Sequence, residues 1–235
     1  MSASNKQSQF AAGGGTPDIT IFRGWKDFGK YVWSPFVIKL EARLRFAGVR
    51  YDVASGSTRT APKGKIPYVD CRSPASGSPG ATTQKVQLSD STLIIKTLAE
   101  WGTIPDLNAA IRPEDRAKDL GLSALLEDKL YFYHGAGRFT PEEIARFRHE
   151  IWESFSDLLR ASKAKLEDRK ENPFWVLGGD DPTEADCVLF GFIVSVLICT
   201  AAPDSQKVVR SFPVLLEYAD RIHDKYFPDY EKWPL

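Results

Sequence analysis

Ser34 is the first residue of this chain whose type and position could do chemistry. It stands directly before Pro35 at the start of a predicted helix, and the first turn of a helix leaves backbone N–H groups without partners. These groups and the helix dipole favour a negative charge, so a hydroxyl there could donate to a bound thiolate and lower the pKa of that thiol. Taken alone, the segment favours a simpler interpretation, an N-cap before a proline at the first helical position.

A second candidate segment is Lys65-Ile66-Pro67-Tyr68, in which a proline opens a predicted strand. A cis peptide bond before such a proline is rare and is usually a functional feature. In that arrangement the backbone of Ile66 could pair with a bound peptide like an added strand, and Lys65 could meet a carboxylate of the ligand. The alternative is an ordinary proline at the edge of a sheet.

Asp90 and Ser91 form the third candidate segment, between a predicted strand and the apolar run 93–95. The Ser91 hydroxyl and N–H could bind a carboxylate at a helix start, and Asp90 could face an ammonium group of the same ligand. A polar helix cap is the alternative. Each of the three segments is a weak signal by itself, whereas their order and spacing along the chain are more specific.

The elements that must position these residues follow from composition and periodicity. β-Branched and aromatic runs predict short strands, and apolar residues three and four apart predict helices. Strands are expected at 19–22, 51–53, 66–69 and 86–88, and helices at 35–47 and 91–101. This order, β-α-β followed by β-β-α, is typical of a thioredoxin-like α/β domain. We therefore predict such a domain over residues 18–104. Residues 1–17 predict a disordered leader, and the Ser-, Pro- and Gly-rich segment 72–85 predicts a long surface loop.

Over residues 105–235 the periodicity is helical throughout, which predicts an all-α bundle as the second domain. Helices are expected at 113–133, from Thr140 through Leu159, from Thr183 onwards, and at 212–226. Residues 187–202 carry no charge, but these sixteen residues are fewer than the roughly 20 that a membrane span needs. We therefore expect a buried central helix, opened by a capping box between Thr183 and Asp186 and ended by Pro203.

The composition narrows the class of protein. Lysine and arginine together balance aspartate and glutamate, so no overall charge attracts nucleic acid or an anionic membrane. Cys71, Cys187 and Cys199 form no CxxC motif, which fits a reducing compartment and excludes a CxxC oxidoreductase. The three histidines lack metal-ligand spacing, so no metal is expected. Because no signal peptide or presequence pattern is present, the expected location is the cytoplasm.

Aromatic residues near Ser34 and at the end of the predicted helix 113–133 could line an apolar pocket for a hydrophobic co-substrate. The candidates are Trp25, Trp33, Phe36, Tyr131 and Tyr133. The alternative, which the pattern favours, is that these aromatic side chains form core between the two domains. His134 and Arg138 lie beside a glycine-containing turn and receive no role.

At these residues the chain resembles the glutathione transferase superfamily, and most of all its metaxin-like and failed-axon-connections-like branch. The matching stretches are Ser34-Pro35-Phe36 running on to Tyr51, Pro62 to Tyr68, Leu88 to Ile95, Pro182 to Gly191, and Phe212 to Pro228. The resemblance implies a thioredoxin-like domain that binds glutathione and a helical domain against which an electrophile binds. Its motifs are specific for the fold and less specific for the activity.

The resemblance further implies a detoxifying transferase that conjugates the glutathione thiolate to small hydrophobic electrophiles. The residues that would hold glutathione are Ser34, Lys65, Ile66, Pro67, Asp90 and Ser91. Ser34 would face the thiol, and Pro67 would be the cis proline. Because a serine cannot form the mixed disulfide that a cysteine forms, no thiol-transferase or deglutathionylation activity is expected through Ser34. Superfamily members are commonly dimers, so a homodimer is expected.

The residues leave two alternatives open. Some members of this branch are import or interaction proteins, so the chain could be a metaxin-like component at the mitochondrial outer-membrane surface. The sequence shows neither a presequence nor a C-terminal apolar span, which counts against that alternative. The chain could also bind glutathione, or glutathione conjugates, without catalysing a reaction.

Overall fold

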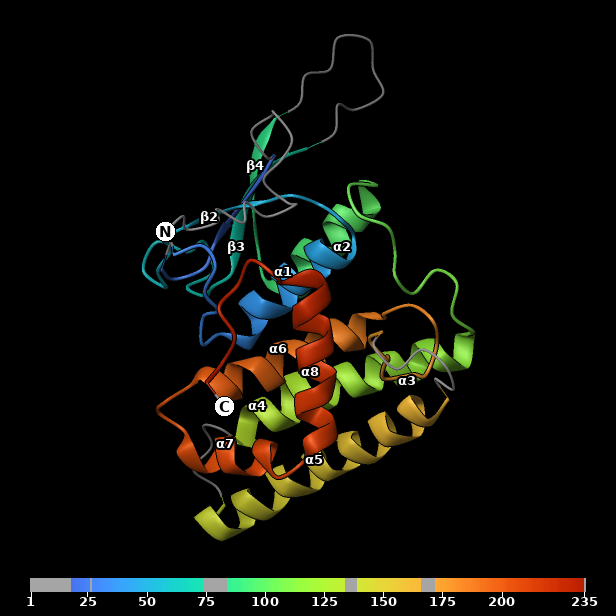
Figure 1. Ribbon diagram of the computed structural model, residues 1–235. Helices are drawn as coiled ribbons and strands as arrows, with labels where there is room; N and C mark the ends of the chain where they lie inside the picture. Colours follow the sequence, from blue (N-terminus) through green and yellow to red (C-terminus); the bar gives the residue numbers. More distant parts are fainter. Residues whose placement is uncertain (1–17, 26, 74–83, 134–138, 166–171, 235) are drawn as a thin grey trace, which may run out of the picture.

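The computed structural model describes residues 18–25, 27–73, 84–133, 139–165 and 172–234. In Figure 1 the sheet lies in the upper part of the molecule, and the helices that follow α2 lie largely below it. The elements in chain order are β1 (Ile19–Phe22), α1 (Pro35–Phe46), β2 (Asp52–Ala54), β3 (Tyr68–Arg72), β4 (Lys85–Ser89), α2 (Ser91–Glu100), α3 (Pro113–Ala124), η1 (Leu125–Leu130), α4 (Tyr131–Tyr133), α5 (Pro141–Ala164), α6 (Glu184–Ile198), α7 (Pro203–Arg210) and α8 (Pro213–Tyr226). The predicted fold class, a thioredoxin-like α/β part followed by a helical bundle, is confirmed.

The four strands form one mixed sheet in the order β2-β1-β3-β4. β1 runs parallel to β2 and antiparallel to β3, and β3 pairs antiparallel with β4. Parallel pairing of consecutive strands requires a crossover connection, which α1 supplies. The predicted surface loop 72–85 falls mostly outside the described residues, and the predicted leader 1–17 falls wholly outside them.

Helix α1 is buried on nearly every side, although its sequence predicts only one apolar stripe. Ten of its twelve residues are buried. Leu40 and Leu44 belong to the core between the sheet and α2, whereas Ile38 and Ala42 belong to the core of the helical part. The helix therefore lies between two hydrophobic cores, of which the apolar periodicity marks only the first.

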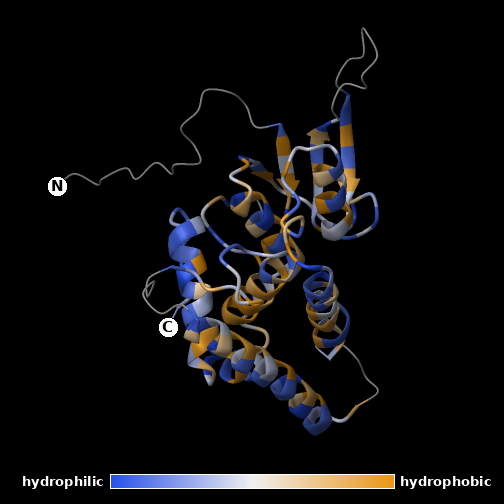
Figure 2. Ribbon diagram, turned by 90° about the vertical axis from the view of Figure 1, so that its right-hand side faces the viewer, coloured by the Kyte–Doolittle hydropathy of each residue, from blue (hydrophilic) through white to orange (hydrophobic). Residues whose placement is uncertain are grey.

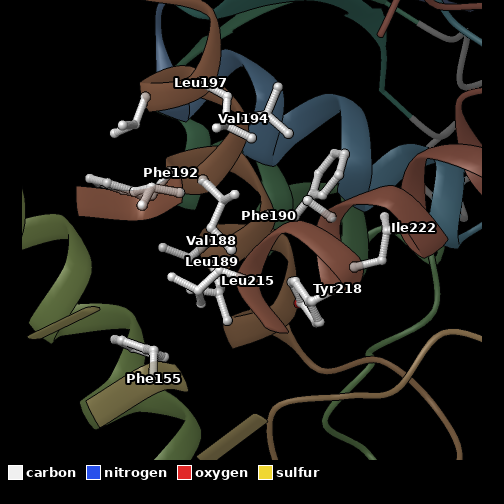
Figure 3. Packing of buried hydrophobic residues seen from close by; sticks show 14 of the residues in the cluster. Phe155, Val188, Leu189, Phe190, Phe192, Val194, Leu197, Leu215, Tyr218 and Ile222 are labelled. Carbon is white, nitrogen blue, oxygen red and sulfur yellow. The ribbon is translucent and has the colours of Figure 1, made fainter. Parts of the chain in front are cut away.

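Helix α6 forms the centre of the helical part, as its uncharged sequence predicts. Thirteen of its fifteen residues are buried. At its start, the N–H and hydroxyl of Thr183 donate to Asp186 Oδ2 at 2.8 and 3.0 Å, so the predicted link between these two residues is present. Figure 3 shows side chains of α5, α6 and α8 that meet in this core: Phe155, Val188, Leu189, Phe190, Phe192, Val194, Leu197, Leu215, Tyr218 and Ile222.

None of the helices in the described ranges has both the length and the apolar character that crossing a bilayer requires. Coloured by hydropathy, the lower helices in Figure 2 carry orange and blue residues on the same ribbon. This pattern is expected of helices that bury one face and expose the other.

Two helical details differ from the sequence-based expectation. The predicted helix 113–133 is continuous, but Leu125–Leu130 within it is π-helical. The spacing of apolar residues did not predict this segment, because one extra residue in a turn changes that spacing very little. In addition, α6 already ends at Ile198, and Pro203 begins α7 rather than only ending its predecessor. Proline is favoured at the first position of a helix because its missing N–H is not needed there.

Candidate functional site

The register of the sheet brings the predicted segments to one edge. Phe22 at the end of β1 pairs with Tyr68 at the start of β3, and Tyr68 pairs with Ser89 at the end of β4. Pro67 and Asp90 therefore flank these paired residues at the same end of the sheet. Because α1 connects β1 to its parallel neighbour β2, it begins at that end as well.

Ser34 occupies the N-cap position of α1, but its side chain does not cap the helix. Its carbonyl oxygen accepts the N–H groups of Val37 and Ile38, each at 3.2 Å. Its hydroxyl makes no hydrogen bond to any described residue, and the side chain is half-buried. The hydroxyl at this helix N-terminus is therefore available to a ligand.

Helix α6 holds the residues on both sides of Ser34. A Cβ atom at Gly191 would lie 2.6 Å from the Pro35 carbonyl oxygen, so only glycine allows α6 to approach α1 this closely. The Ser195 hydroxyl donates to the carbonyl oxygen of Trp33. The position of the Ser34 backbone thus depends on the helical part of the molecule.

The Ile66–Pro67 peptide bond is cis, as expected. The β3 ladder begins at Tyr68 rather than at Ile66 as predicted, because proline has no N–H to donate to a neighbouring strand. Gly24, with a φ of +102°, packs against Ile66, whose Cδ1 would lie 3.5 Å from a Cβ at that glycine. Lys65 is exposed immediately before this bond.

Asp90 is the N-cap of α2 and has a φ of 76°. Its Oδ1 accepts the N–H groups of Thr92 and Leu93 at 3.0 and 3.1 Å, so the interpretation as a polar cap is confirmed. A positive φ in a residue other than glycine costs about 1–3 kcal/mol and is concentrated at functional sites. Ser91 begins the helix and is buried, and its hydroxyl makes no hydrogen bond to a described residue.

Four of the predicted pocket aromatics form two ring pairs, and each pair includes a residue within two positions of Ser34 in the chain. The Trp25 and Trp33 rings meet edge to face with centroids 6.3 Å apart, and Phe36 lies 5.1 Å from Tyr131 of α4 in the same manner. The exposed fractions of Trp25, Trp33 and Tyr131 are 42%, 49% and 51%. The expectation that these three form core between the domains is therefore wrong, and they present apolar surface instead.

The fifth predicted pocket residue, Tyr133, belongs to a different aromatic group. Its ring stacks on Phe147 at 5.1 Å and meets Phe139 edge to face at 6.0 Å. It therefore helps to attach α4 to α5. His134 and Arg138 lie outside the described residues.

Lys39 was not singled out by the sequence, yet it links three elements around the site. Its ammonium donates to Thr92 Oγ1 of α2 at 2.8 Å and to Glu127 Oε1 of η1 at 2.5 Å. The Lys39 side chain is 6% exposed and that of Glu127 is 20% exposed. The local pattern gives no signal for this role, because the partners lie 53 and 88 residues away in the chain.

A second missed feature is a buried charged cluster behind the loop that leads to Ser34. Glu41 Oε1 accepts hydrogen bonds from Arg23 Nη1 at 2.7 Å and from the Tyr230 hydroxyl at 2.9 Å. Burial raises the pKa of the Glu41 carboxyl, and the neighbouring Arg23 opposes that rise. Arg23 also donates to the carbonyl oxygen of Lys30, so this cluster fixes the loop between β1 and α1.

The three cysteines are free thiols. Burial raises the pKa of Cys71 to about 11 and raises the pKa of Cys187 well above its usual range. Both thiols are therefore protonated at neutral pH and are not activated nucleophiles. In the described part of the chain, no three metal-ligating side chains come together.

Comparison with known proteins identifies the family. A model of the Glutathione S-transferase N-terminal domain matches residues 35–144, and one of the Glutathione S-transferase C-terminal domain matches residues 156–222. A glutathione transferase family member from Pseudomonas fluorescens is 17% identical with a TM-score of 0.58, covering 88% of each chain. Glutathione transferase Omega 3C from Trametes versicolor is 13% identical with a TM-score of 0.61, covering 94% of this chain and 92% of the other.

A curated relative is the protein Failed axon connections of Drosophila melanogaster, which is 23% identical over 85% of this chain. This chain spans 56% of the length of that protein. The likeness to the solved structures shows the fold, and the N-terminal and C-terminal domain models follow each other along the chain in the expected order. The chain belongs to the glutathione transferase superfamily.

Proposed function

We propose that this chain binds glutathione at the edge of the sheet and transfers its thiolate to a small hydrophobic electrophile. The observation that carries the proposal is the Ser34 hydroxyl at the N-terminus of α1, which makes no hydrogen bond within the described ranges. The sheet register sets the Ile66–Pro67 bond and the Asp90–Ser91 segment at the same edge. The related protein from Pseudomonas fluorescens was crystallised with two glutathione bound.

In this proposal Ser34 stabilises the nucleophile. Glutathione loses its thiol proton to solvent, and the thiolate accepts a hydrogen bond from the Ser34 hydroxyl beside the free N–H groups of α1. The thiolate sulfur then forms a bond to the electrophilic carbon, and the displaced electron pair leaves with the departing group. The exposed faces of Trp25, Trp33 and Tyr131 offer an apolar surface for the electrophile.

The rest of the tripeptide would be held by backbone and polar groups. The backbone of Ile66 pairs with it as an added strand would, and the exposed Lys65 meets a carboxylate. Ser91, whose hydroxyl has no partner among the residues described, donates a hydrogen bond to the γ-glutamyl carboxylate. Asp90 uses Oδ1 for the helix cap, which leaves Oδ2 for the ammonium group.

Binding is tested by titrating the purified chain with glutathione in a calorimeter. The double variant Asp90→Asn, Ser91→Ala should bind at least roughly tenfold more weakly, because it loses a charge and a hydroxyl contact. Asparagine still caps a helix and tolerates a positive φ, so the fold is retained. Asp204→Asn, at the exposed start of α7, is the matched control. A wild type that does not bind millimolar glutathione contradicts the proposal.

Catalysis is tested with 1-chloro-2,4-dinitrobenzene as the electrophile. Ser34→Ala should lower kcat/KM by roughly 10- to 100-fold, since it removes a hydrogen bond to a charged group. The pH dependence of kcat/KM should move to higher pH because the bound thiol becomes less acidic. Ser154→Ala, on the exposed face of α5, is the control. If a glutathione-binding wild type turns over neither this substrate nor other electrophiles, the chain is a binding protein without transferase activity.

A further inference from the structure

A cavity of about 640 Å³ lies between α2 and α3, with residues of α1, η1 and α6 completing its lining. Its volume is within the range of small-molecule sites. Although α2 and α3 are both described along their whole length, they do not pack on each other. We propose that this α2–α3 cavity is a binding site for an organic cation with an apolar body, independent of the proposed transferase function.

The lining carries an excess of negative charge. Six carboxylates and three cationic side chains line the cavity. One of the cations, Lys39, is already paired with Glu127 at 2.5 Å and hydrogen-bonded to Thr92. The buried ammonium is therefore not available as a receptor for an anionic ligand.

Glu127 is paired with Lys39 and Glu184 with Arg43, which leaves four lining carboxylates against two lining cations, Lys96 and Arg116. Glu100 at the end of α2 and Asp128 in η1 are exposed and have no partner among the described residues. Asp119 is 2% exposed and accepts only from neutral donors, the Asn108 amide at 2.7 Å and the Ala185 N–H at 2.9 Å. The field inside the cavity therefore favours a positively charged ligand.

The apolar part of the lining points to an organic cation rather than a bare metal ion. Ile95 of α2 and Val188 of α6 contribute buried apolar side chains, and Leu120 of α3 is 71% exposed beside them. No three metal-ligating side chains gather anywhere in the described ranges. An amine with an aromatic or alkyl body would bury its carbon atoms against these residues and leave its ammonium near Glu100 and Asp128.

The experiment titrates the full chain with 4-phenylbutylamine and compares it with the neutral 4-phenylbutan-1-ol and the anionic 4-phenylbutyrate. We expect saturable binding of the amine, weaker binding at higher salt, and no saturation by the alcohol or the carboxylate. Saturating glutathione should leave the affinity for the amine unchanged, because none of the proposed glutathione contacts, such as Ser34, Ile66 and Ser91, lines the cavity. Competition between the two ligands would place the amine at the Ser34 site and overturn the proposal.

Two variants locate the site. Glu100→Gln, Asp128→Asn should weaken amine binding roughly tenfold, whereas Glu153→Gln, Asp157→Asn, two exposed α5 carboxylates outside the cavity, should not. Ala124→Trp fills the cavity from an exposed position on α3 and should abolish binding without removing a charge. An unchanged affinity in both cavity variants, or equal binding of the alcohol and the amine by the wild type, would also overturn the proposal.

Discussion

At the residue scale, the distance between α1 and α6 is set by the absence of one side chain. The backbone of α1 passes so close to Gly191 that a Cβ there would lie 2.6 Å from the Pro35 carbonyl oxygen and 3.0 Å from the backbone nitrogen of Lys39. Both of these contacts are backbone atoms, which cannot rotate away as a flexible side chain could. A methyl group would therefore push apart two helices whose contact also fixes the start of α1.

Gly191→Ala should destabilise the protein by about 1–3 kcal/mol, the usual cost of adding volume to a tightly packed core. Gly121→Ala is the matched control, because a Cβ at this helical glycine has no heavy atom within 4 Å. That control should be stabilising by about 0.4–1 kcal/mol, since alanine restricts the unfolded chain. Urea unfolding of both variants provides the measurement, and equal effects of the same sign would contradict this account.

At the element scale, the segment after α8 has no regular secondary structure but is held firmly. Asp229 forms an ion pair with Arg45 of α1 at 2.5 Å, with side chains 6% and 1% exposed. The N–H of Glu231 donates to the Gly29 carbonyl oxygen at 2.7 Å, and Tyr230 completes the Arg23–Glu41 cluster. The segment that contains residues 229–231 thus holds both α1 and the loop before Ser34 in position.

Asp229→Asn should reduce the free energy of unfolding by about 3 kcal/mol, because it removes the negative charge that accepts two hydrogen bonds from the buried Arg45 guanidinium. Asp157→Asn is the comparison, since that aspartate forms an exposed pair with Arg160 and should change stability by about 0–1 kcal/mol. Chemical denaturation at neutral pH measures both. If Asp229→Asn lowers the free energy of unfolding no more than the surface variant does, the segment does not stabilise the position of α1.

At the scale of the whole molecule, His223 and Asp186 are two buried groups with opposite effects on stability as the pH falls. Burial, with a smaller contribution from Lys232, lowers the pKa of His223 to about 4. Neutral His223 shares a hydrogen bond of 2.8 Å with Tyr31. Burial also raises the pKa of Asp186 to about 6. As the pH falls from about 6.5 to 4, His223 is protonated in the unfolded chain before it is protonated in the native state, so its contribution to stability is lost. Asp186 is protonated in the native state first, so its contribution to stability increases.

His223→Asn should make the protein less sensitive to acid. The amide can keep a hydrogen bond to Tyr31 but takes up no proton, so the destabilising effect of His223 is removed while the stabilising effect of Asp186 is kept. The variant should therefore lose less stability than the wild type between pH 7 and pH 4.5, by on the order of 1–3 kcal/mol. Urea unfolding at the two pH values measures the difference, with the exposed His149→Asn as control. If the wild type, His223→Asn and His149→Asn lose equal stability between the two pH values, His223 is not the acid-sensitive group.

The sequence by itself determined the features that depend on near neighbours in the chain. Alternation and three-to-four spacing located the strands and the main helices, and short cap motifs located Thr140 and Thr183 at helix starts. The cis bond before Pro67 and the N-cap position of Ser34 were also expected and are present. Residue type and local spacing are enough here because backbone conformation and capping depend on atoms a few residues apart.

Only the tertiary structure decided which groups are buried, paired or left facing solvent. Arg45 and Asp229 are 184 residues apart in the sequence but form a buried ion pair, and Trp33, an aromatic residue expected in the core, is 49% exposed. The cavity between α2 and α3 likewise depends on the tertiary structure, because its lining combines Lys39 of α1 with Glu184 and Val188 of α6. Burial and charge pairing are sums over all neighbours in space, and a local pattern contains no information about neighbours that the fold brings from elsewhere in the chain.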